Sequence, residues 1–133
     1  MSQENVAIVK EFHSLFEAGN REAWRNHFHP DVVWDASASD LPMAGVYNGH
    51  EGIERFFTEW LGIWDDYEVE HREFVDAGDS VVVVFLQRGR GKLSGAAAER
   101  EFFGVYDLEA GKVRRYRAFE SREEAMEEAG LTP

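Results

Sequence analysis

The spacing of hydrophobic residues changes near Trp64, and this change restricts the fold more than any other feature of the sequence. Before it, apolar residues recur at helical intervals in residues 4–20 and 50–64. After it, they alternate or run together as in β-strands, and turns containing Gly separate the runs. Helices followed by an antiparallel meander predict an α+β fold. A curved sheet with helices on its concave face would leave a cone-shaped cavity between the two layers.

Residue patterns divide the chain into predicted elements without any domain boundary. Gly19 ends the first helix, Asn20 caps a short second helix, and Pro30 stops that helix. Ser121 and Glu124 have the spacing of a capping box before the last helix. We therefore expect a single domain, 1–133, with a loop that includes short extended pieces over 38–50, helices over 4–20, 21–28, 50–64 and 121–130, and strands over 31–37, 66–79, 80–91, 99–112 and 113–120.

Composition excludes several classes of function. The net charge of −12 argues against nucleic acid and against an anionic membrane surface, because both bind basic proteins. The chain has no cysteine, which excludes disulfides, thiolate metal sites and a Cys nucleophile. It has no apolar run of about 18 residues, and its first residues lack the pattern of a signal peptide. We expect a cytoplasmic protein.

Aromatic residues are more numerous than core packing requires. The chain has ten Phe, four Trp and four Tyr among 133 residues. Pockets for small molecules are mostly apolar and aromatic, so this surplus is typical of a lined pocket. A bulky core is the alternative explanation for any single ring.

The histidines and glycine-rich segments indicate neither a metal nor a cofactor. His27, His29, Asp31 and Asp35 lie close in sequence, but their spacing matches no known set of ligands, so surface histidines are favoured. His13, His50 and His71 are isolated in the sequence. Residues 88–92, RGRGK, lack the spacing of a phosphate-binding loop.

Two carboxylates are the candidate acid–base catalysts. Asp35 and Glu120 each follow an aromatic residue at the end of a predicted strand, Trp34 and Phe119 respectively. Burial would raise the pKa of either group and suit it to general acid–base work near neutral pH. Solvated carboxylates at strand ends are the alternative.

The sequence resembles SnoaL-like (polyketide cyclase-like) proteins of the nuclear transport factor 2-like superfamily over nearly its whole length. The resemblance rests on FEAGNREAW, HPDVVWDAS, GVYNGHEGIERFFTEW, VDAGDSVVVVFLQRGRGK and GKVRRYRAFESREEAMEEAGL. It implies a cone-shaped, curved antiparallel or mixed β-sheet packed on N-terminal helices, also described as a cystatin-like α+β barrel. It also implies a binding site in the cavity and a homodimer through the convex face of the sheet. The superfamily includes cyclases, isomerases, hydrolases, dehydratases and binding modules, so the fold alone does not fix the function.

Strand parity in this family implies which side chains face the pocket. The last strand directs Tyr116, Ala118 and Glu120 inward, and places Arg115, Arg117 and Phe119 on the dimer side. The apolar run from Val81 to Leu86 also needs a cover on its second face, which supports the dimer. The predicted ligand-binding residues are Trp34, Tyr47, Phe57, Trp60, Trp64, Phe85, Gln87, Gly104, Tyr106, Tyr116 and Ala118, and Ala36, Val83 and Phe102 face the same side.

The catalytic residues of known family members are absent from the matching positions. The isomerase positions hold Phe12, Ala36 and Gly104, and the epoxide hydrolase positions hold Phe85, Gln87 and Ala118. We therefore expect a pocket that binds an apolar, polyketide-like or steroid-like small molecule without a cofactor. The alternative is a cofactor-free isomerase, cyclase or hydratase with Glu120 or Asp35 as general acid–base, and with Gln87, Tyr106 and Tyr116 orienting the substrate.

Overall fold

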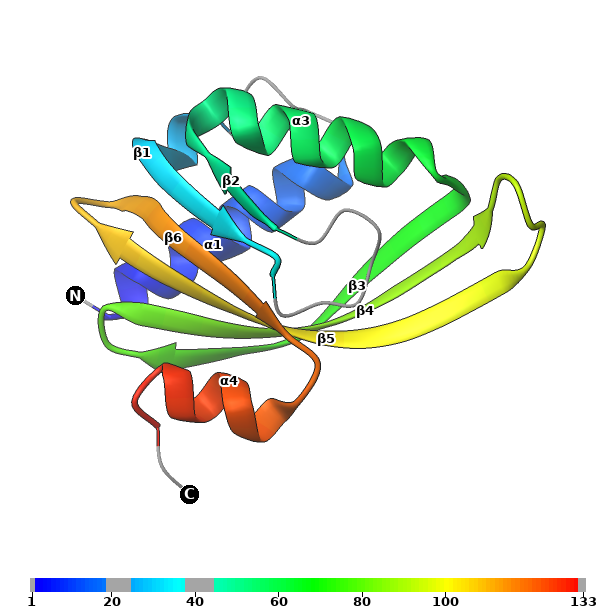
Figure 1. Cartoon of the computed structure of the whole chain (residues 1–133). Coiled ribbons are helices and arrows are strands. Elements are labelled where there is room, and N and C mark those ends of the chain that lie inside the picture. The colour runs from blue at the N-terminus through cyan, green and yellow to red at the C-terminus, as the bar shows by residue number, and fades with distance from the viewer. Residues whose placement is uncertain (1, 19–24, 38–44, 132–133) are drawn as a thin grey trace.

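One curved sheet of six strands runs through the molecule in the order β2-β1-β6-β5-β4-β3 (Figure 1). The structure is a computed structural model that describes residues 2–18, 25–37 and 45–131. Strands β1 and β6 pair in parallel, and the other neighbours pair antiparallel, so the sheet is mixed. The elements are α1 (Ser2–Glu17), the 3-10 turn η1 (Arg25–His27), β1 (Phe28–Asp35), β2 (Val46–Asn48), α3 (Gly49–Gly62), β3 (Trp64–Ala77), β4 (Ser80–Gly91), β5 (Ala97–Glu109), β6 (Lys112–Phe119) and α4 (Arg122–Glu128).

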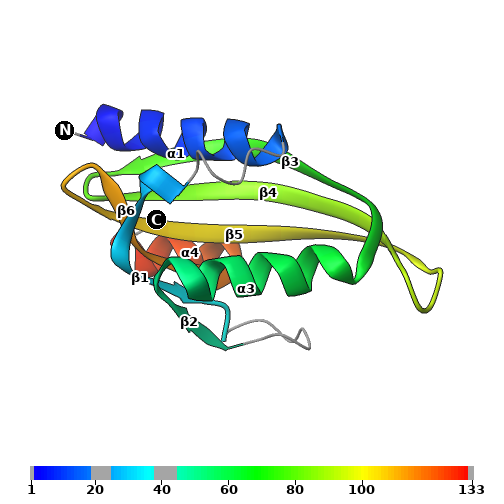
Figure 2. The ribbon, with the colours of Figure 1, turned by 90° about the horizontal axis from the view of Figure 1, so that it is seen from above.

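The helices divide between the two faces of the sheet. Helices α1 and α3 lie over the concave face, and α4 lies against the opposite, convex face (Figures 1 and 2). Helix α3 buries Ile53, Phe57 and Trp60, whose spacing forms one stripe along the helix. Ser121 caps helix α4, and its hydroxyl accepts a hydrogen bond from the Glu124 N–H at 3.4 Å. The predicted α+β architecture is confirmed.

Several element boundaries differ from the prediction. Helix α3 ends at Gly62, and Trp64 begins β3, because the chain there pairs with Gly91 at the end of β4. Residues 21–24 of the predicted helix over 21–28 lie outside the described residues, and so do Gly19 and Asn20. Within the described part, Phe28 already begins β1. Pro30 lies inside β1, where the pairing with β6 is irregular because proline has no N–H to donate.

Two hydrophobic clusters fill the two faces of the sheet. The concave cluster joins α1 and α3 to the sheet, with Phe12, Phe57, Phe85 and Tyr106 among its members. The convex cluster lies under α4 and consists of Val82, Val84, Phe103, Val105 and Ala125, with partly buried neighbours around them. Successive residues of β4 and β5 therefore belong to different clusters, as the alternation of side chains along a strand requires.

The second face of β4 is covered within the single chain. Val82, Val84 and Leu86 have exposed fractions of 0%, 4% and 5%. The apolar run on β4 therefore needs no partner subunit to hide it, which removes one of the two reasons for the predicted dimer and leaves the family resemblance as the other. Arg117, which was assigned to the dimer side, is also buried, and it pairs with Asp107.

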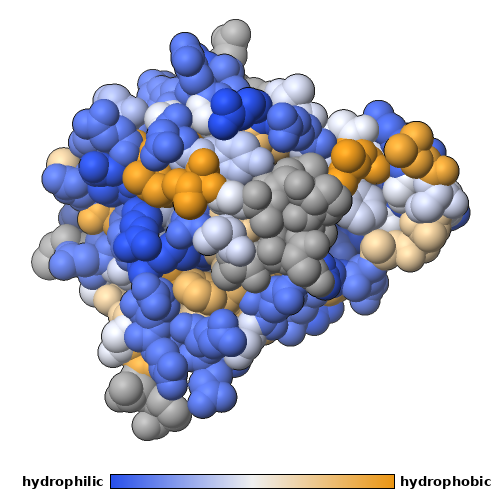
Figure 3. All heavy atoms as spheres, in the orientation of Figure 1, coloured by the Kyte–Doolittle hydropathy of each residue, from blue (hydrophilic) through white to orange (hydrophobic). Residues whose placement is uncertain are grey.

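The outer surface on the side seen in Figure 3 is largely hydrophilic, with separate hydrophobic spots. Among the described residues, the large hydrophobic side chains that remain exposed are Val46, Ile63 and Leu93. No helix in the described part of the chain is long and apolar enough to cross a membrane.

Candidate functional site

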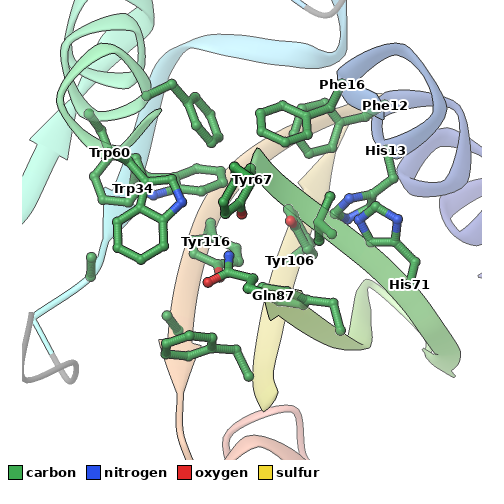
Figure 4. Close-up of a pocket in the computed structure, with 17 residues that line it drawn as sticks. Phe12, His13, Phe16, Trp34, Trp60, Tyr67, His71, Gln87, Tyr106 and Tyr116 are labelled. Carbon is green, nitrogen blue, oxygen red and sulfur yellow. The ribbon is translucent and has the colours of Figure 1, made fainter. Parts of the chain in front are cut away.

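A cavity of about 70 Å³ lies between the two N-terminal helices and the concave face of the sheet (Figure 4). Helix α1 and helix α3 form one wall, and strands β1, β3, β4, β5 and β6 form the other. The lining is mostly aromatic: Phe12, His13, Phe16, Trp34, Ala36, Phe56, Phe57, Trp60, Tyr67, Val69, His71, Phe85, Gln87, Phe102, Tyr106, Tyr116 and Ala118.

A stacked pair of rings forms part of the cavity wall. Trp34 and Tyr116 lie with their ring centroids 3.9 Å apart and their planes 21° apart. The two residues are directly paired between β1 and β6. Gly104 on β5 allows this arrangement, because a Cβ added there would lie 2.6 Å from Cε1 of Tyr116. Absence of a side chain at Gly104 therefore sets the position of the Tyr116 ring.

Several polar groups interrupt the apolar lining. The indole nitrogen of Trp34 and Nε2 of His13 are buried and have no hydrogen-bond partner among the described residues. Burial raises the pKa of Tyr67 to about 12 and raises the pKa values of Tyr106 and Tyr116 as well. These phenols are therefore neutral at physiological pH. Together with the Gln87 amide, they give the cavity hydrogen-bonding groups without a charge.

A carboxylate and two histidines lie together at the α1 side of the cavity. The Nδ1 atom of His71 lies 2.5 Å from a carboxylate oxygen of Glu17. The ring of His71 lies 3.9 Å from the ring of His13, measured between centroids. Burial lowers the pKa of His13 well below its usual value, and the neighbouring His71 lowers it further. Burial also lowers the pKa of His71, although its hydrogen bond to Glu17 opposes this effect.

Most of the predicted ligand-binding residues are brought together around the cavity. Three are not. Tyr47 packs against Phe56, Trp64 lies over Gly89, and Gly104 lies beneath Tyr116. Those that line the cavity are Trp34, Phe57, Trp60, Phe85, Gln87, Tyr106, Tyr116 and Ala118. Contact of these residues with a ligand stays a prediction.

The two predicted catalytic carboxylates lie outside the cavity lining. Glu120 follows the last residue of β6, its side chain is 41% exposed, and it pairs with Arg100 at 3.3 Å. Asp35 accepts hydrogen bonds from the backbone N–H and the hydroxyl of Ser37. Its chain neighbours Trp34 and Ala36 both line the cavity. Alternation along β1 therefore directs Asp35 away from the cavity.

The histidines near the start of β1 are engaged with neighbours of their own. His27 pairs with Glu11 at 3.5 Å, and Nδ1 of His29 accepts the backbone N–H of Asp31 at 3.0 Å. Among residues 2–18, 25–37 and 45–131, no group of three or more His, Asp or Glu side chains is arranged to hold a metal ion.

The cavity residues that sequence reasoning missed come mainly from α1 and β3. Tyr67, Val69 and His71 alternate with Glu68 and Glu70 along β3, and this alternation identifies their shared inward face. The sequence around His13 has no comparable pattern that would place its side chain at the cavity. It faces His71 only because α1 packs across β3, and a helix–strand contact of this kind is not encoded in local spacing.

Comparison with known proteins agrees with this architecture. The sequence matches the SnoaL-like domain over residues 9–116, and no curated protein matches it. A solved NTF2-like protein from Burkholderia thailandensis is 24% identical, with a TM-score of 0.81, over 96% of this chain and 98% of its own. TerC, co-crystallized with polyporic acid, is 23% identical, with a TM-score of 0.76, over 96% of this chain and 98% of its own.

A further similar structure is a protein with a ketosteroid isomerase-like fold from Catenulispora acidiphila, in complex with trimethylamine. It is 16% identical, with a TM-score of 0.72, over 94% of this chain and 93% of its own. These likenesses establish the fold, and the domain match spans most of the sequence. The chain belongs to the SnoaL-like family and has the NTF2-like fold.

Proposed function

We propose that this protein binds a small, planar, largely apolar molecule in the cavity between α1, α3 and the concave face of the sheet. The observation that carries the proposal is the wall of aromatic rings with buried polar atoms that lack partners in the part of the chain that the structure describes. Trp34 combines both features, because its ring stacks on Tyr116 while its indole nitrogen has no partner among the described residues. A ligand with an acceptor oxygen would satisfy that nitrogen.

The size of the cavity restricts the ligand. Its volume of about 70 Å³ is well below the roughly 300–1,000 Å³ of pockets for drug-sized molecules. A molecule of one or two fused rings suits this space, with some movement of the lining side chains. The protein from Catenulispora acidiphila was solved with trimethylamine, and TerC with polyporic acid. Both cases support occupancy of this fold by small molecules.

A binding experiment with a cavity-filling variant tests the proposal. The probe is 2-methoxynaphthalene, titrated into the protein while the indole N–H resonance of Trp34 is followed by NMR. We expect saturable binding to the wild type and a loss of at least about tenfold in Ala118→Phe, whose new ring occupies the cavity. Ala97→Phe is the matched control, because Ala97 is exposed on β5. Equal binding to both variants, or no binding to the wild type, would overturn the proposal.

Homodimerisation through the convex face stays a separate prediction. Helix α4 already covers the convex cluster, so a partner would have to pack over α4 and the strands beside it. Light scattering at micromolar concentration tests this prediction directly, since a monomeric mass would contradict it.

A further inference from the structure

We propose that Glu17, His71 and His13 form a proton-accepting site at the α1 side of the cavity, and that the ligand is a phenol or an enol whose hydroxyl donates to His71. The inference rests on the proposed function, since it names the chemical class of the molecule that the cavity binds. The predicted carboxylates Asp35 and Glu120 have no part in it.

The contact between Glu17 and His71 determines which nitrogen of His71 carries the proton. A carboxylate can only accept a hydrogen bond, so the short contact of 2.5 Å requires hydrogen on Nδ1 of His71. A neutral imidazole with hydrogen on Nδ1 has its lone pair on Nε2. The His71 side chain is only 7% exposed, and it lines the cavity. The ring therefore holds its donor toward Glu17, whose side chain is 47% exposed, and keeps its acceptor on the other nitrogen, Nε2.

His13 extends this arrangement into the cavity. Its ring lies 3.9 Å from that of His71 and 5.4 Å from that of Tyr106, between centroids (Figure 4). Nε2 of His13 is buried without a partner among the described residues, which is costly unless a ligand engages it. Burial beside a second imidazole keeps His13 neutral, so one positive charge at most resides on the pair near neutral pH.

Among the described residues, Glu17 is the carboxylate in contact with His71. Glu70 and Arg72, the neighbours of His71 on β3, are exposed. They pair with each other, and also with Arg88 and Glu101 respectively. Lys10 on α1 lies over the ring of Phe74. Among residues 2–18, 25–37 and 45–131, the titratable or charged groups that face or flank the histidine pair are Glu17 and Lys10 from α1, Glu70 and Arg72 from β3, and Tyr106 from β5.

The chemistry of the site follows from these positions. The ligand O–H donates to Nε2 of His71, and on full transfer the O–H bond breaks while an N–H bond forms. The electron pair remains on the ligand oxygen, and Glu17 stabilises the resulting imidazolium. Trp34 and Gln87 also line the cavity and carry neutral donors. No cofactor or further reactant enters this balance.

A paired-ligand experiment tests the inference. The probes are 2-naphthol, which has the hydroxyl, and 2-methoxynaphthalene, in which a methyl group replaces its proton. We expect the wild type to bind 2-naphthol about tenfold more tightly at pH 7.5, and His71→Phe to lose that preference while it still binds 2-methoxynaphthalene. Glu17→Gln should lose part of the preference. Glu11→Gln, on the same helix and in a pair with His27, should keep all of it.

The outcomes separate this inference from the proposed function. If both probes bind the wild type equally, the proton-accepting site is overturned and the binding cavity stands. If neither probe binds, both proposals fail. A ligand-independent readout comes from the ¹⁵N shifts of the histidine side chains in the wild type. We expect His71 to show hydrogen on Nδ1 and a free lone pair on Nε2, and the opposite tautomer would overturn the inference by itself.

Discussion

The concave and convex faces of the sheet are built from the same strands and differ in how they are filled. On the convex face, valines and Ala125 of α4 form one buried cluster with Phe103. On the concave face, large rings such as Phe85 and Trp34 meet the helices at varied angles and leave a cavity. Large rings that meet at varied angles pack with gaps between them more readily than small branched side chains do. The numerous aromatic residues therefore both build the concave core and line the cavity within it.

Buried polar groups also differ between the faces. On the convex side, the Arg117 guanidinium donates to both carboxylate oxygens of Asp107, at 2.9 and 2.8 Å, and also to Glu128 on α4. This charge is compensated within the fold. On the concave side, Trp34 and His13 keep polar atoms that have no partner among the described residues. The convex side also keeps one such atom, Nε of Arg117, within its ion-pair network. The difference is that Trp34 and His13 line a cavity, where a ligand has room.

The largest expected contrast comes from two adjacent phenylalanines on β5. Phe103 belongs to the convex cluster and Phe102 to the cavity wall, with exposed fractions of 7% and 4%. We expect Phe103→Ala to lower the free energy of unfolding by about 4 kcal/mol. Phe102→Ala should cost about 2 kcal/mol, because a side chain beside a cavity has fewer contacts to lose. Urea denaturation measures both. Equal losses would show that the two faces are packed alike.

The ion-pair network should be the next most sensitive point. Asp107→Asn leaves the buried Arg117 with one anionic partner, and we expect a loss of about 2 kcal/mol. Arg117→Met removes the buried charge together with its requirement for partners, so it should cost less than Asp107→Asn. Thermal unfolding of both variants tests the order. If Arg117→Met were the more damaging change, the network would be a net source of stability.

A methyl group added at Gly104 should disturb the concave face alone. The new Cβ would meet Tyr116 at 2.6 Å and Phe85 at 3.3 Å, so we expect Gly104→Ala to cost about 1–2 kcal/mol. Near-ultraviolet circular dichroism should also change, because the Tyr116–Trp34 stack moves. Gly62→Ala is the control, since a Cβ there meets nothing within 4 Å. It should leave stability unchanged or slightly raised.

The smallest expected effect is a pH dependence of the free energy of unfolding, which arises from His13 on the concave side. The pKa of folded His13 lies below the ordinary value of 6.5, so the unfolded chain takes up a proton first as the pH falls. Stability is therefore complete above pH 6.5 and decreases toward lower pH, by at most about 1.4 kcal/mol per pH unit for each proton. Unfolding at pH 7.5 and 5.5 measures the slope. His13→Phe should reduce the slope, and His71, whose pKa burial also lowers, should account for part of the remainder. An unchanged slope would assign it to groups other than His13.

Local spacing predicted much of the fold and about half of the site. The stripe of Ile53, Phe57 and Trp60 identified α3, and the alternation within 66–79 identified most of β3. The family resemblance supplied the inward parity of Tyr116 and Ala118, and the structure places both at the cavity.

The remaining features depend on contacts between distant segments. Nothing in the spacing of residues 121–130 reveals that α4 lies on the convex face, where it buries Ala125. The three-residue strand β2 is too short to give a period. His13 and His71 are separated along the chain by the end of α1, by β1, β2 and α3, and by the first half of β3, so each is isolated in the sequence. Their proximity arises only when α1 packs on β3.

Gly104 has a consequence for how this site can change. The position of the Tyr116 ring depends on a single hydrogen atom beneath it, on the strand that also carries the convex cluster through Phe103 and Val105. A substitution at Gly104 can therefore alter the shape of the cavity by moving the Tyr116 ring, although Gly104 itself does not line the cavity. Relatives that differ at this one position could differ in ligand choice while sharing every aromatic residue of the wall, and comparisons limited to the lining would miss the cause.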